Sequence, residues 1–125
     1  MSTTATHRAT IAAAVEHVDA VWAIWEKLQV AGQEADERWR AADSADREAT
    51  RAGDTAAAER AEQAAAELDA LRRTIGATEM SARAAHGRAV AAVHAAVASA
   101  GADAADACQG MSHHVVDEAL YAVLG

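Results

Sequence analysis

The chain of 125 residues contains no proline and no phenylalanine, and aromatic residues make up only 3% of it. Strands favour β-branched and aromatic residues, and the turns between them rely on glycine and proline, so a β-sandwich or barrel is close to excluded. Alanine accounts for 39 residues, and the larger apolar residues recur at regular intervals. This regular spacing also argues against a disordered chain. The composition therefore predicts one all-α domain.

Basic residues are scarce as well. Eleven Lys and Arg residues face 19 Asp and Glu residues, which gives a net charge of −8, and Lys27 is the only lysine. Because nucleic-acid binding is driven by the neutralisation of phosphates, this charge argues against direct binding of nucleic acid. Residues 34–69 hold eleven acidic and five basic side chains. Heavy use of Ala, Arg, Val and Asp with almost no Lys is typical of a GC-rich genome, so we expect a bacterial or phage origin.

Cysteine occurs once, at Cys108, so no disulfide forms within the chain. The charged and polar residues Glu16, His17 and Asp19 interrupt the first apolar run, which does not fit a signal peptide. The longest uncharged stretch, residues 89–102, is too short to cross a bilayer. We therefore expect a soluble, cytoplasmic protein that makes no membrane contact.

Two long segments, residues 4–52 and about 55–100, carry apolar residues every seven positions with a companion row three or four residues away. This is the pattern of helices that pack along each other. Gly53 and Asp54 separate the segments, because glycine favours a helix end and aspartate caps the next helix. A second turn is expected at Gly101, followed by a last helix over about 103–124.

The turn at Gly53 predicts the register of the hairpin. If the long helices fold back about this turn, residues whose numbers sum to about 107 lie at the same level. Gly32 then faces Ile75, Trp25 faces Ala82 and Trp39 faces Leu68, so a large side chain meets a smaller one at each level. Gly76 lies at the level of Gly32, and the pattern leaves open whether it breaks the second helix. Gly110 is expected to kink the last helix.

The predicted fold is therefore an all-α, long antiparallel helical hairpin with a coiled-coil-like stalk. The stalk covers about residues 34–76, and the base covers about residues 5–33 with 77–125. In the base, the shorter C-terminal helix completes a three-helix bundle. Trp22 and Trp25 are expected in the core of the base.

Six histidines make the base a candidate ligand site. The hairpin register brings His94 level with Cys108, with His17 nearby, and two imidazoles with a thiolate suit zinc. No Cys-x-x-Cys or His-Glu-x-x-His motif accompanies them. Separate boundary histidines and a buried cysteine are the favoured interpretation, so no metal and no other cofactor is predicted.

Catalytic motifs are absent from the sequence: it has no glycine-rich phosphate loop and no nucleophile elbow. The favoured function is a non-enzymatic protein–protein interaction or assembly module: a small acidic subunit, adaptor or inhibitor. It is expected to self-associate as a dimer through the stalk or to bind a larger protein partner. The alternative function is a metal- or small-ligand-binding helical bundle that uses the histidine-rich base.

Trp39 is the candidate contact residue of the stalk, because few large neighbours are predicted around it and tryptophan is enriched at interface hot spots. Acidic side chains of the same segment are expected to attract a partner with a basic groove. The candidate partner-binding residues are Trp39, Glu34, Glu37, Asp43, Asp46 and Glu48.

Overall fold

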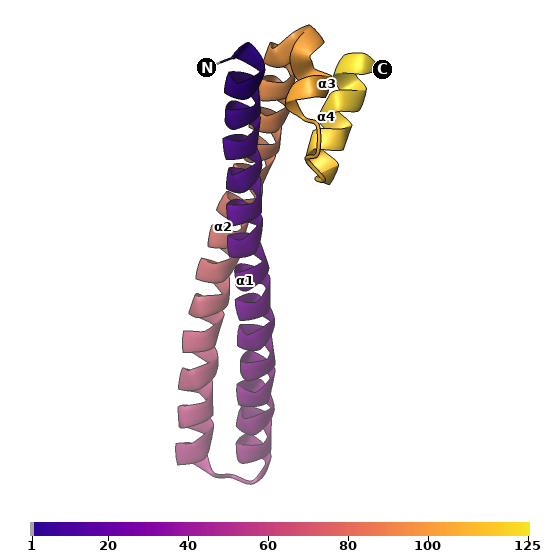
Figure 1. Cartoon of the computed structure of the whole chain (residues 1–125). Coiled ribbons are helices and arrows are strands. Elements are labelled where there is room, and N and C mark those ends of the chain that lie inside the picture. The colour runs from indigo at the N-terminus through magenta and orange to yellow at the C-terminus, as the bar shows by residue number, and fades with distance from the viewer. Residues whose placement is uncertain (1) are drawn as a thin grey trace. The chain divides into compact units, whose positions relative to one another are not determined.

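The computed structural model describes residues 2–125, and helices dominate it (Figure 1). Helix α1 (Thr3–Arg51) and helix α2 (Thr55–Ala100) form the antiparallel hairpin. They are followed by the 3-10 helix η1 (Gly101–Asp103) and by the short helices α3 (Ala104–Ala107) and α4 (His114–Leu124). Residues 2–125 contain no strand. The predicted all-α hairpin with a short C-terminal helix is confirmed.

The turn between the long helices has the predicted chemistry. Gly53 adopts a φ of +72°, a conformation that side chains with a Cβ rarely reach. The carboxylate of Asp54 accepts a hydrogen bond of 3.1 Å from the backbone N–H of Ala57, and so caps the start of α2. Gly101 also has a positive φ, +56°, and it follows the last residue of α2 as Gly53 follows the end of α1.

The chain forms two compact units. We call residues 25–81 the hairpin unit; it contains the Gly53 turn and the adjoining parts of α1 and α2. We call residues 2–24 with 82–125 the bundle unit; it contains the start of α1, the end of α2 and all later elements. Among the helices of residues 2–125, none has the length and apolar character needed to cross a bilayer.

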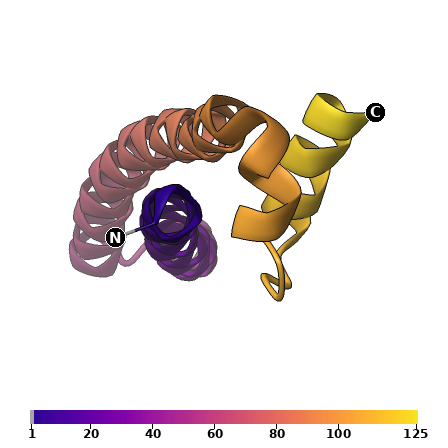
Figure 2. The same ribbon diagram turned by 45° about the horizontal axis from the view of Figure 1, so that its top comes forward.

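The bundle unit is built around one apolar core that draws on α1, α2, α3 and α4. Figure 2 shows α3 and α4 beside the C-terminal end of α2. Because α4 contributes buried side chains to the same core as the two long helices, it completes a three-helix bundle. The largest fully buried side chains are those of Ile11, Val18, Val93, Val97, Val115 and Val116.

The prediction of one continuous helix over residues 103–124 is wrong. The chain leaves α3 after Ala107 and starts α4 at His114, and Gly110 between them has a φ of +81°. A left-handed residue ends the hydrogen-bond ladder of a helix instead of merely bending it. The guanidinium of Arg8 donates hydrogen bonds to the carbonyl oxygens of Ala107 and Gln109, which fixes this connection against α1.

Helix α2 continues through Gly76, so this glycine does not break it. The predicted register of the hairpin is confirmed at Gly32, where an added Cβ would lie 3.6 Å from Cγ2 of Ile75. That distance is ordinary van der Waals contact, so the helices approach closely here without needing the glycine.

Candidate functional site

The hairpin unit has almost no buried core. Ala35 is the one buried hydrophobic residue within residues 25–81, and it is an alanine. Larger apolar side chains of the same unit are exposed: Val30, Leu71 and Met80, the last with 75% of its surface open to solvent. A pair of helices without a third neighbour can bury few of its apolar side chains completely.

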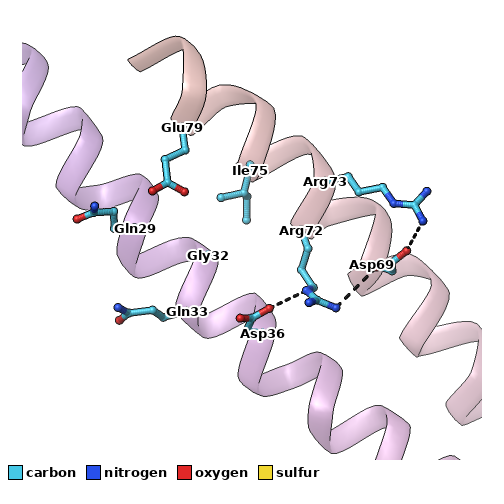
Figure 3. Close-up of a pocket in the computed structure, with 10 residues that line it drawn as sticks. Gln29, Gly32, Gln33, Asp36, Asp69, Arg72, Arg73, Ile75 and Glu79 are labelled. Atoms are coloured by element: carbon cyan, nitrogen blue, oxygen red, sulfur yellow. Dashed lines mark ion pairs between the residues drawn. The ribbon is translucent and has the colours of Figure 1, made fainter. Parts of the chain in front are cut away.

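A groove of about 610 Å³ runs between α1 and α2 in this unit (Figure 3). Gly32 and Gly76 help to open it, because neither contributes a side chain. Ile75 points into the space between the two helices and forms part of the apolar floor. The remaining lining is polar or charged: Gln29, Gln33, Asp36, Asp69, Arg72, Arg73 and Glu79.

Two arginines organise the charges of the groove. Nε of Arg72 lies 2.7 Å from a carboxylate oxygen of Asp36 across the hairpin, and Nη1 of Arg72 lies 3.7 Å from Asp69 (Figure 3). Arg73 pairs with the other oxygen of Asp69 at 2.9 Å, although its own side chain is 81% exposed. The groove therefore displays both signs of charge side by side.

Trp39 is half-buried, and the guanidinium carbon of Arg72 lies 4.6 Å from its ring centre. This cation–π contact supplies a neighbour that the sequence pattern did not predict, because the pattern was built from apolar residues and Arg72 is charged. The register predicts this neighbour by counting: the numbers of Asp36 and Arg72 sum to 108, so the two residues lie level with each other, as Gly32 and Ile75 do.

The predicted acidic residues divide into two groups. Glu34, Glu37 and Glu48 are exposed, and no ion pair forms to them within residues 2–125. Asp43 pairs with Arg47 one turn later at 2.8 Å. Asp46 accepts a hydrogen bond of 3.5 Å from the hydroxyl of Thr50. Of the five predicted acidic residues, the three glutamates are thus the most open to a partner.

The bundle unit holds a second, smaller cavity of about 120 Å³, lined by side chains from α1, α2 and α4. Trp22, predicted to lie in the core, instead has 43% of its surface exposed and forms one wall. Its ring centre lies 5.3 Å from that of His86, at an angle of 52° between the rings. We call this cavity the Trp22 pocket; its lining residues are Val18, Asp19, Trp22, His86 and His114.

His113, the N-cap residue of α4, contacts two residues that line the pocket, Asp19 and His114. Its Nδ1 accepts a hydrogen bond of 3.1 Å from the backbone N–H of Val115, so this nitrogen carries no proton. The proton is therefore on Nε2, which donates to the Asp19 carboxylate at 2.9 Å. The ring of His113 also stacks on that of His114, with centres 4.9 Å apart. The sequence pattern gives no indication of this cap, because helix caps are normally Ser, Thr, Asp or Asn.

The structure does not gather the candidate metal ligands. His17 is exposed, His94 is half-buried, and Cys108 is buried in the apolar core. Burial raises the pKa of the Cys108 thiol, which opposes the thiolate form that binds metals. Within residues 2–125, no three His, Cys, Asp or Glu side chains lie close enough together to hold a metal ion.

Comparison of the chain with protein-family models, with curated proteins and with solved structures yields no match.

Proposed function

We propose that this chain is a non-enzymatic protein–protein interaction module that works through its hairpin unit, and that its first partner is a second copy of itself. The observation that carries the proposal is the missing core of that unit, where Ala35 is the one buried hydrophobic residue. Each exposed apolar side chain that a second copy covers adds about 25 cal/mol per Å² of buried area.

The surface of the hairpin unit also supports self-association. A two-fold symmetric interface uses the same patch on both copies, so the patch must be complementary to itself. The groove meets this condition, because both arginines and carboxylates line it, and Leu71 and Met80 supply exposed apolar area on the same helix. The exposed guanidinium of Arg73 and the carboxylate of Glu79 are one such pair of opposite charges.

The oligomeric state in solution tests this proposal. Sedimentation or light scattering at rising protein concentration should show a monomer–dimer equilibrium. The hairpin unit has thirteen acidic and eight basic residues, a net charge of −5 that copies share. Salt screens repulsion between like charges, over a Debye length of about 14 Å at 0.05 M and about 4 Å at 0.5 M. The dimer should therefore be more populated at 0.5 M than at 0.05 M salt.

Two matched substitutions locate the interface. Leu71→Lys places a charge on the hairpin unit and should weaken the dimer about tenfold or more. Leu124→Lys makes the same chemical change at an exposed leucine of the bundle unit and should leave the dimer unchanged. A chain that stays monomeric at millimolar concentration in both salts overturns the proposal, and so does equal weakening by both substitutions.

We propose further that the acidic side of the hairpin unit recruits a larger protein with a basic groove. Glu34, Glu37 and Glu48 are the exposed acidic side chains that support this step. Reversing all three to Lys should slow association several-fold and flatten its salt dependence, since such charges act mainly on the association rate. Unchanged binding kinetics in the triple variant would remove this surface from the proposal.

A second candidate function, small-ligand binding, is favoured by the Trp22 pocket of the bundle unit. Ligand sites are usually pre-formed cavities with mostly apolar or aromatic walls. The Trp22 pocket is such a cavity, and the packed core of the bundle unit supports it.

A further inference from the structure

We infer that the Trp22 pocket binds a methylated ammonium group. This inference names the ligand class of the second candidate function and rests on it, and it is independent of self-association by the hairpin unit. The juxtaposition that carries it is an indole, two imidazoles and a carboxylate around one small cavity.

The walls of the pocket match the chemistry of a bulky organic cation. The face of an aromatic ring carries partial negative charge and attracts a cation, most strongly for tryptophan. Trp22 supplies such a ring, and His86 lies tilted against it with ring centres 5.3 Å apart. Two rings at an angle form a corner instead of a flat stack, so a rounded group can contact both. The buried side chain of Val18 closes the apolar end.

The carboxylate of Asp19 provides the opposite charge. It lines the pocket and keeps 64% of its side chain exposed while it accepts the Nε2 proton of His113. A carboxylate has two oxygens and about four lone-pair sites, so this one hydrogen bond leaves capacity for a cation. Because His113 also caps α4 through Nδ1, the carboxylate is held in place by a helix end.

The size of the cavity selects the group. A cavity of about 150 Å³ takes benzene, so the 120 Å³ of the Trp22 pocket suits the five heavy atoms of a tetramethylammonium head. A primary ammonium ion is small and strongly hydrated, and it would have to give up water that these walls do not replace. Methyl groups remove that hydration cost and fill the apolar volume.

The test compares choline with 3,3-dimethyl-1-butanol, its neutral carbon isostere, in NMR titrations of the whole chain at pH 8. The two probes have the same shape and differ in charge. Choline should bind at least about tenfold more tightly, and the largest shifts should fall on the indole N–H of Trp22 and on His86. Tetramethylammonium should behave as choline does, and ammonium ion should not bind.

Substitutions assign the binding to the pocket. Trp22→Leu should lower the affinity for choline about tenfold or more, while Trp22→Tyr should retain part of it, since tyrosine keeps a ring face. Asp19→Asn should weaken choline binding several-fold. Glu16→Gln removes the same charge from an exposed residue three positions earlier on α1 and serves as the control with unchanged affinity. Circular dichroism confirms that each variant keeps its helical content.

The source of the group is resolved by a second pair of probes, choline and N-acetyl-trimethyllysine amide. Tighter binding of choline assigns the pocket to small free amines, and tighter binding of the lysine derivative assigns it to methylated lysine side chains of proteins. If the neutral isostere binds at Trp22 as tightly as choline, the inference fails and the ligand-binding function stands. If no probe shifts any resonance of the pocket, both fail.

Discussion

Cys108 illustrates how a single residue is controlled by its surroundings. Only 4% of its surface is exposed, and burial raises the pKa of its thiol above the ordinary value of 9.0, although the charge of Arg8 opposes the rise. The thiolate is the reactive form, so we expect a disulfide reagent to modify the native protein far more slowly than the protein in urea. Labelling of native protein at the unfolded rate would contradict this placement.

Asp103 has a lowered pKa, which makes the stability of the protein depend on acid pH. Hydrogen bonds from His7, at 3.0 Å, and from the hydroxyl of Thr4, at 2.7 Å, hold the pKa of this carboxyl below its ordinary value of 3.8, while partial burial works the other way. A lowered folded-state pKa adds stability above the ordinary value, and that stability is lost as pH falls through the folded value. Asp103→Asn should therefore show a shallower loss of the urea midpoint below about pH 4. Identical profiles for both proteins would rule out this role.

At the scale of the element, replacing each of two glycines by alanine should change the free energy of unfolding in opposite directions. Gly76 lies inside α2 with nothing within 4 Å of an added Cβ, so Gly76→Ala should stabilise the chain by about 0.5–1 kcal/mol. Gly53 has a positive φ in the turn, so Gly53→Ala should destabilise it by about 1 kcal/mol. Urea unfolding measures both. Equal effects of the two substitutions would be inconsistent with an unbroken α2.

Helix α4 depends on its unusual cap. It has 11 residues, a length at which an isolated helix is marginal in water. Replacing His113 by Ala removes the acceptor for the N–H of Val115 and the contact with Asp19, and should cost about 1 kcal/mol. His113→Asn restores a capping group and should recover much of that loss in thermal unfolding. If both variants melt alike, the cap contributes little.

At the scale of the whole molecule, the two units should differ in local stability along the same helices. Residues 86–100 of α2 pack against the apolar core of the bundle unit. Residues 55–81 of the same helix belong to the hairpin unit, in which Ala35 is the one buried hydrophobic residue. We expect hydrogen exchange in residues 55–81 to be at least about tenfold faster. Uniform exchange along α2 would mean that the helix opens only as one cooperative block.

The hairpin could be predicted from the sequence, because the position of the turn determines which residues of the two long helices lie level. Once Gly53 and Asp54 are taken as the turn, the pairing of Gly32 with Ile75 follows by counting, and the same count places Trp22 beside His86. Helical periodicity is a strong signal in long segments such as these.

The same reasoning failed wherever a third element decides the outcome. Periodicity shows which face of a helix is apolar, and it does not show whether a neighbour covers that face, so Trp22 was misplaced in the core. Gly110 was expected to kink the last helix and instead ends it, because a glycine in the sequence does not reveal the sign of its φ. The histidine cap of α4 had no sequence signal, since its acceptor role depends on the contact with Asp19.

The register of the hairpin has a kinetic consequence. Partners on α1 and α2 are close in sequence near Gly53 and grow more distant away from it, until Thr4 meets Asp103 of η1, just after α2, across 99 positions. Closing a loop costs more entropy as it lengthens, by only about 0.6 kcal/mol per doubling, but each pair that forms shortens the loop left for the next. Folding should then proceed as a zipper from Gly53, which substitutions beside the turn would reveal by slowing folding rather than speeding unfolding. The unit with the weakest interior would then be the folding nucleus, and the well-packed bundle would be the last part to form.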